Sequence, residues 1–268
     1  MKILFPTDFS SHANFSLRYA IDLTNKLKAE LHVLYVHPNF LDDRAHLKIE
    51  DISLAHAENE LSGLITGIVP LLSHNNIPQF TLLQGNVDAV ILKYIKEETI
   101  DLVVMGTQGR SKAQNFIFGS TTKIIAANSS VPVLAVPRCK YLKLDNKKIL
   151  LALDNHEIKN SKTFECLNQI AKAFYMSYEL LHIISKKEND FPFDPYALSY
   201  LKEPIGKIKI LKNINIINGI NDYIKKDDKI AIVTVIKRKK GFLKSLLNMS
   251  ISSKEIYNTS LPLLILNE

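Results

Sequence analysis

The sequence has 268 residues, 46% hydrophobic and 23% charged, which is enough for one large globular domain or two domains of about 130 residues. It has no run of roughly eighteen apolar residues and only two cysteines, which excludes a membrane-spanning helix and a disulfide framework and predicts a cytoplasmic protein. The net charge of +7 comes from residues 141–268, which have 21 Lys and Arg against 14 Asp and Glu. No nucleic-acid-binding motif accompanies this positive charge, so we interpret the basic residues as a solvated surface.

Short apolar runs alternate with helix-like segments in the first half of the chain. The runs are residues 3–5, 31–36, 80–83, 102–105 and 133–136. A helix is expected to begin near Ser10, since an apolar residue recurs at every fourth position, at Phe15, Tyr19, Leu23 and Leu27. A second helix is expected from residue 51 to about residue 72, with Pro70 kinking or ending it. This alternation predicts a parallel sheet covered by helices on both faces.

The order of elements restarts in the second half. Residues 2–8 read KILFPTD and residues 148–154 read KILLALD. Residues 130–134 read SVPVL and residues 260–264 read SLPLL, so the offset is 146 at the start of the copies and 130 at their ends. We therefore predict a tandem repeat.

The repeat predicts the domain organisation. We expect an α/β protein with two tandem doubly wound domains, each built on a five-stranded parallel sheet. The expected bounds are residues 1–138 and 148–268, joined by a polar linker at 139–147. Any ligand should bind at the carboxyl ends of the strands.

Three of the nine glycines lie within fourteen residues, directly after the fourth apolar run. Gly106 and Gly109 follow the strand, and Gly119 with Ser120 opens the next predicted helix. Glycine lets the backbone turn sharply or approach a ligand closely, and a helix N-terminus offers N–H groups to an anion. The arrangement predicts a site for the phosphates of a nucleotide.

This motif and the N-terminal strand resemble the universal stress protein family, over residues 1–137 and more faintly over the rest. In that family G-x-x-G, nine residues, then G-S or G-T marks the members that bind ATP, and this sequence fits without departure. The resemblance implies the adenine nucleotide alpha hydrolase-like fold and a part in stress survival. It also assigns five residues outside the motif to the nucleotide site: Pro6, Thr7, Asp8, Val36 and Met105.

The phosphates are expected to meet the motif itself. N–H groups around Gly109 and Gly119 would hold them, and the Ser120 hydroxyl would donate one more hydrogen bond. Thr121 continues the same helix and is a candidate for a further contact. Arg110 either reaches the phosphates or lies exposed to solvent.

The remaining residues are expected around the nucleoside. The resemblance implies that Val36 and Met105 sandwich the adenine. Asp8 either accepts a hydrogen bond from ribose or adenine, or helps with a metal-bound water, or caps the first helix. The expected ligand is ATP, or ADP or AMP, together with Mg²⁺.

The second copy has lost the glycines. At the offset of 130, Ile236, Lys239 and Met249 stand where the first copy has Gly106, Gly109 and Gly119, and only the serine survives, as Ser250. Neither isoleucine nor methionine easily provides a positive φ or a close backbone approach. We therefore expect a degenerate second domain. Its basic residues 237–240 are either a solvated loop or a site for another anion.

The sequence offers no catalytic machinery beside the motif. Neither a P-loop nor a dinucleotide motif is present, and the eight histidines form no metal-binding pair. His32 and His182, within apolar strands, are expected to be hydrogen-bonded core groups. Since phosphoryl transfer needs a positioned acceptor, a metal and cationic charge, we predict no catalytic residue, no protein metal site and at most slow ATP hydrolysis.

Three functions stay open. The first is a stress-response switch, in which ATP orders residues 107–118 and alters the surface met by an unknown regulatory protein partner. The second is a slow ATPase or nucleotidyl-transferring enzyme on the same fold, and the third is a nucleotide-independent scaffold. Family members pair through the last strand, so the two halves are expected to form an intrachain pseudo-dimer. Whether two chains then form a homodimer is left open.

Overall fold

The computed structural model describes residues 1–38, 47–73, 77–107, 118–138, 141–153, 157–158, 160–184, 198–212, 216–238 and 261–268. The elements of the first half are β1 (Lys2–Thr7), α1 (Ser11–Leu27), β2 (Glu30–His37), α2 (Leu47–Ile68), the short 3-10 helix η1 (Val69–Leu71), β3 (Gln79–Gln84), α3 (Val87–Glu97), β4 (Leu102–Gly106), α4 (Ser120–Asn128) and β5 (Val133–Val136). Those of the second half are β6 (Lys148–Leu153), the 3-10 helix η2 (Ser161–Phe164), α5 (Glu165–Ala173), β7 (Ser177–Ile184), β8 (Ile205–Lys212), α7 (Ile216–Ile224), β9 (Ile230–Lys237) and β10 (Leu263–Asn267).

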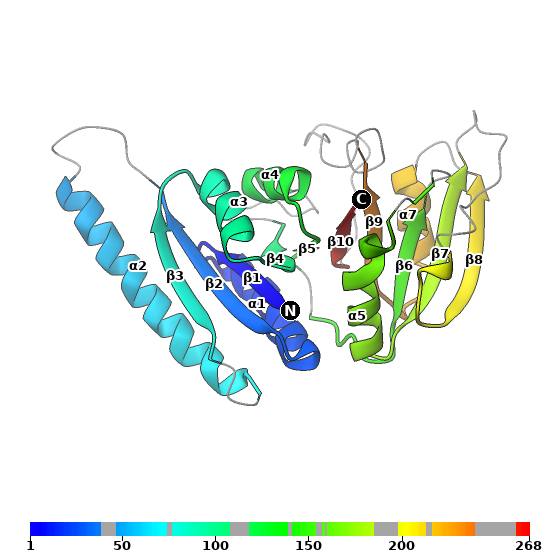
Figure 1. The fold of residues 1–268 in the computed structure, drawn as a ribbon, viewed down its shortest axis with the longest axis horizontal. Helices are drawn as coiled ribbons and strands as arrows, with labels where there is room; N and C mark the ends of the chain where they lie inside the picture. The colour runs from blue at the N-terminus through cyan, green and yellow to red at the C-terminus, as the bar shows by residue number, and fades with distance from the viewer. Residues whose placement is uncertain are drawn as a thin grey trace.

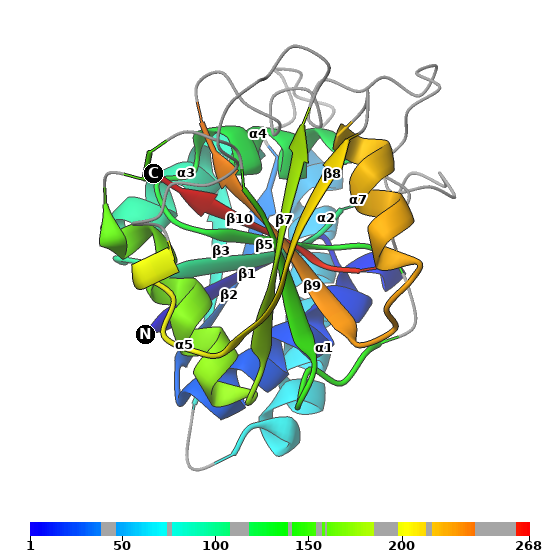
Figure 2. The ribbon, with the colours of Figure 1, turned by 90° about the vertical axis from the view of Figure 1, so that its right-hand side faces the viewer.

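The ten strands form one sheet in the order β3-β2-β1-β4-β5-β10-β9-β6-β7-β8 (Figures 1 and 2). Neighbouring strands run parallel within each half, and β5 pairs with β10 antiparallel where the halves meet. Counted outward from this junction, the halves share one strand order. The predicted α/β class is confirmed, and the two expected five-stranded parallel sheets are the two halves of one continuous sheet.

The junction between the halves follows the internal repeat. Leu134 of β5 pairs with Leu264 of β10, which is its own counterpart at the offset of 130. Ala135 pairs with Leu263, and Val133 pairs with Ile265. At the same offset Leu263 is the counterpart of Val133 and Ile265 that of Ala135, so each flanking pair is the repeat counterpart of the other. Such self-complementary pairing is what a two-fold axis produces between identical subunits.

Buried apolar side chains cover both faces of the sheet. One cluster runs through both halves and includes Phe5 and Leu134 as well as Phe164 and Leu264, all fully buried. Helices α1 and α5 pack on this face and touch each other across the junction. On the opposite face each half has its own cluster, under α3 and α4 in the first half and under α7 in the second.

The two helices expected at the N-terminus are present, with one boundary shifted. Helix α1 begins next to Ser10, as expected, Ser10 is its N-cap, and Tyr19 and Leu23 of the apolar stripe are buried. Helix α2 begins at Leu47, four residues before the predicted start, and Pro70 lies in η1 directly after its end. No helix in the described part of the chain, α2 included, is long and apolar enough to cross a membrane.

Candidate functional site

A pocket of about 470 Å³ lies at the carboxyl ends of β1, β2 and β4, beside the first turn of α4. Strand β1 has β2 on one side and β4 on the other, so the chain order reverses here, and open α/β sheets bind ligands at such points. Nine predicted site residues line this pocket: Pro6, Thr7, Asp8, Val36, Met105, Gly106, Gly119, Ser120 and Thr121. The other two, Gly109 and Arg110, lie outside the described residues.

One part of the pocket wall is apolar. Val36 and Met105 are 6% and 5% exposed and come from neighbouring regions of the sheet. Leu34 of β2 and Val87 and Ile91 of α3 extend the same wall, and sequence reasoning missed all three. The spacing of Val87 and Ile91, one helical turn apart, marks a face packed on the sheet, but no feature of the sequence distinguishes a pocket wall from ordinary core.

The turn after β1 is held by its own side chains. Phe9 N donates to Thr7 Oγ1 and Ser10 N donates to Asp8 Oδ1, both at 3.0 Å, while Phe9 adopts a left-handed φ of 57°. Ser10 Oγ accepts from Ala13 N at 3.2 Å and thereby caps α1. The helix-capping role considered for Asp8 therefore belongs to Ser10. Asp8 instead shapes the turn and lines the pocket.

The first turn of α4 forms the polar side of the pocket, together with Thr7 and Asp8. Gly119 precedes the helix with φ −57° and ψ 157°, a conformation open to any residue, so positive φ is not the reason for a glycine there. Its N–H donates to Thr107 O, and Thr122 Oγ1 donates to Gly106 O at 2.7 Å. These bonds join the two ends of the glycine motif, and they place Ser120 and Thr121 at the pocket.

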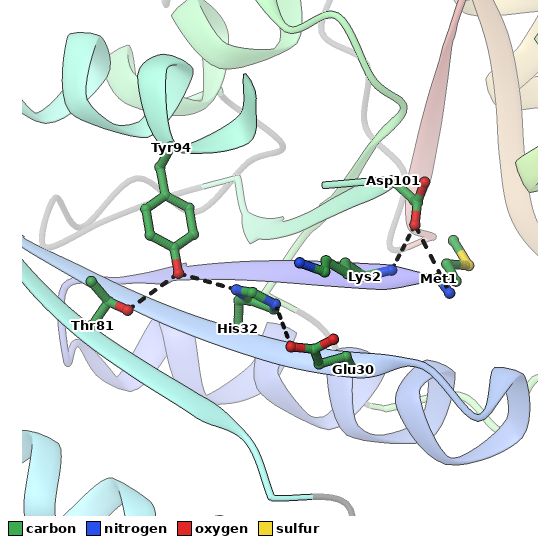
Figure 3. Close-up of polar contacts among 7 residues, drawn as sticks. All are labelled: Met1, Lys2, Glu30, His32, Thr81, Tyr94 and Asp101. Carbon is green, nitrogen blue, oxygen red and sulfur yellow. Dashed lines mark hydrogen bonds and ion pairs between the residues drawn. The ribbon is translucent and has the colours of Figure 1, made fainter. Parts of the chain in front are cut away.

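A buried histidine in the first half joins β2 to α3 (Figure 3). His32 Nδ1 lies 3.1 Å from Tyr94 Oη, and Nε2 lies 3.1 Å from Glu30 Oε1. Tyr94 Oη also lies 3.2 Å from Thr81 Oγ1, so one tyrosine of α3 contacts both β2 and β3. In the second half, His182 Nδ1 donates to Leu153 O at 2.9 Å. The prediction that both histidines are hydrogen-bonded core groups is confirmed.

The environment of His32 predicts a loss of stability in acid. The pKa of His32 is lowered, chiefly by burial and further by Lys2, although the neighbouring Glu30 and Glu98 act in the opposite direction. As the pH falls through about 6.5, the His32 imidazole therefore binds a proton in the unfolded chain before it does so in the folded protein. The free energy of unfolding decreases as a result. Urea unfolding at pH 7.5 and 5.5 should show a smaller decrease in His32→Gln than in the unchanged protein. An equal decrease in both would contradict the assignment.

Strand register identifies the counterpart of this site in the second half. Ile3 pairs with Leu102 in the first half, and its repeat counterpart Ile149 pairs with Ile232 in the second. Gly106 therefore corresponds to Ile236, as the offset of 130 predicts, and Ile236 is 9% exposed and belongs to the hydrophobic core. The counterparts of Gly109 and Gly119 and the surviving Ser250 lie outside the described residues.

The described residues hold no group of three or more His, Cys, Asp or Glu side chains placed to bind a metal ion.

The family model for the Universal stress protein family matches residues 1–137, and the chain belongs to this family. A universal stress protein of Methanocaldococcus jannaschii is 28% identical over 158 residues, which are 51% of this chain and 94% of that protein. One of Synechocystis is 26% identical over 133 residues, which are 50% of this chain and 41% of that protein.

A solved structure extends the likeness to the whole chain. The crystal structure of a universal stress protein from Archaeoglobus fulgidus matches with a TM-score of 0.70 and 17% identity, over 100% of this chain and 96% of that chain. At this identity the likeness shows the fold, which is the adenine nucleotide alpha hydrolase-like fold that the sequence predicts.

Proposed function

We propose that this protein is an ATP-binding regulatory member of its family, with one nucleotide site in the first half. The pocket at the ends of β1, β2 and β4 carries the proposal. Its volume of about 470 Å³ is within the range of roughly 300–1,000 Å³ typical of small-molecule sites. Its apolar wall suits a base, and its polar side contains a helix N-terminus, which suits phosphate.

The lining residues support one orientation of the nucleotide. Adenine would lie against Val36 and Met105, which are apolar and nearly fully buried. The phosphates would meet the N–H groups at the start of α4 and the Ser120 hydroxyl. Gly109 and Arg110 stay predictions, because they lie outside the described residues.

Magnesium fits this site as a companion of the nucleotide. Mg²⁺ is commonly held by one or two carboxylates together with substrate phosphates, and Asp8 provides one carboxylate at the pocket. When bound, the ion would neutralise phosphate charge. The described lining provides one carboxylate, Asp8, and no Lys or Arg to place positive charge on a transferring phosphate, which supports binding rather than rapid hydrolysis.

We propose further that the second half, residues 148–268, is a degenerate repeat that does not bind nucleotide. Ile236 supports this, because its side chain fills the core at the position of Gly106. Of the basic residues 237–240, Lys237 donates to Ser129 O and Arg238 pairs with Glu268 at 3.5 Å, so both make contacts within the chain. These contacts favour a structural role over an anion site for the described part of this segment.

The self-complementary pairing of β5 with β10 supports an intrachain pseudo-dimer. In this proposal the first domain, residues 1–138, binds ATP, and the second takes the place of a partner subunit. Because a nucleotide at the pocket contacts α4, binding would change the surface that a regulatory partner meets.

Calorimetric titration of ATP with Mg²⁺ into nucleotide-free protein tests the proposal. We expect saturable binding with a stoichiometry near one. A stoichiometry near two would show that the second half also holds nucleotide. If ATP produced neither heat nor a thermal shift, the nucleotide-independent scaffold would be the favoured function. Turnover of labelled ATP would instead favour a slow ATPase or nucleotidyl-transferring enzyme.

A further inference from the structure

Helix α4 is shared between the two halves of the molecule. Its residue Ile125 is fully buried in the first-half cluster that also contains Val36 and Met105 of the pocket. The next residue, Ala126, is fully buried in a different cluster, formed mainly by second-half residues such as Leu263 and Ile265. The helix whose first turn lines the pocket is thus packed against the second half by its other side, which agrees with its central place in Figure 1.

The last turn of α4 also receives a hydrogen bond from the second half. Lys237 Nζ, at the end of β9, donates to Ser129 O at 2.6 Å, across 108 residues of sequence. Ser129 is the C-cap of α4, is 2% exposed, and its N–H donates to Ile125 O at 2.8 Å. Carbonyls at a helix C-terminus lack intrahelical partners and carry partial negative charge, so a lysine there stabilises the helix end.

Lys237 occupies an informative position in the repeat. It follows Ile236, the counterpart of Gly106, and therefore corresponds to Thr107 at the start of the glycine motif. The end of β9 is where a nucleotide site of the second half would begin. Through Lys237 it instead contacts α4, the helix whose first turn lines the pocket of the first half. Burial lowers the pKa of Lys237, which agrees with an amine held inside a contact rather than in solvent.

We infer that the second half of the chain braces α4 for nucleotide binding in the first half, with Lys237 as a positioning residue. The inference rests on the proposed function, because it assigns the regulation of that same pocket. The brace has two components: the packing of Ala126, and the bond from Lys237 to the helix end. Together they fix the axis of α4, and with it the direction of the N–H groups at its first turn.

Three variants of the full chain test the brace. Lys237→Met removes the donor, Lys237→Arg keeps a cationic donor, and Lys209→Met is the control, since Lys209 is an exposed lysine of the same half. We expect Lys237→Met to weaken ATP binding by about tenfold in calorimetry and to speed hydrogen exchange of the α4 amides. Lys237→Arg should restore most of both, and Lys209→Met should change neither.

The two readouts separate the brace from the nucleotide site. Unchanged exchange in α4 together with unchanged ATP affinity in Lys237→Met would overturn the brace. If the unchanged protein binds no ATP, the proposed function fails, and exchange in α4 still decides whether Lys237 holds the helix. If Lys237→Met does not fold, Lys237→Gln, which keeps a shorter neutral donor, replaces it in both measurements.

Discussion

Replacing Gly119 by valine is expected to abolish ATP binding while the protein stays folded. The residue directly precedes the first turn of α4 and lines the pocket, so a valine side chain would occupy the space that a phosphate needs. Crowding of this kind should weaken binding by about two orders of magnitude or more. The backbone at φ −57° accepts valine, so the free energy of unfolding should change by about 1 kcal/mol or less.

A matched substitution separates the site from a general effect of valine. Gly63 lies in α2, and a Cβ atom added there meets nothing within 4 Å. Gly63→Val should therefore bind ATP as the unchanged protein does, in calorimetry at equal protein concentration. Gly109→Val, which the motif also predicts to be inactive, extends the test to residues outside the described part. Wild-type affinity in both motif variants would falsify the placement of the phosphates.

The site was largely predictable because its residues follow from strand order. Val36, Met105 and Asp8 each lie at or just after the end of an apolar run, and parallel strands bring such ends to one edge of the sheet. The glycine motif then indicates the side of the sheet on which phosphates would lie. Neither inference requires knowledge of side-chain packing.

Other features of the site depend on geometry that the sequence does not encode locally. Asp8 and Ser10 are equally good capping residues two positions apart, and only the left-handed turn at Phe9 decides that Ser10 caps α1. The bond from Lys237 to Ser129 depends on how the halves meet through β5 and β10, more than a hundred residues apart. A tendency of glycine for positive φ is likewise irrelevant at Gly119, although Gly119 does line the pocket.

The repeat also shows how a buried polar position diverged between the halves. Leu4 pairs with His32 in the first half, and its counterpart Leu150 pairs with Glu179 in the second. Each of these polar residues contacts a tyrosine from a following helix: Tyr94 of α3 contacts His32, and Tyr223 of α7 donates to Glu179 at 2.8 Å. A neutral histidine can stay buried without a counter-ion, but an ionised carboxylate cannot do so at low cost.

Lys148 provides this counter-ion, and its loss is expected to be severely destabilising. Its Nζ lies 2.5 Å from Glu179 Oε1 and 2.7 Å from Asp227 Oδ2, and Glu179 is 1% exposed. Hydrogen bonds to Asp227 and Glu179 raise the pKa of Lys148, so the amine stays charged. Lys148→Met would leave the Glu179 carboxylate buried without a cation and should reduce the free energy of unfolding by about 3 kcal/mol.

Chemical denaturation of three variants distinguishes an unpaired charge from lost packing. Lys93→Met removes a lysine whose ion pair with Glu97 is exposed, and it should change the unfolding midpoint little. Adding Glu179→Gln to Lys148→Met removes the unpaired negative charge of the Glu179 carboxylate. The glutamine still provides an acceptor for Tyr223 Oη, so most of the free energy of unfolding should be recovered. If the double variant stayed as unstable as Lys148→Met, packing of the lysine stem, rather than its charge, would hold this end of the sheet together.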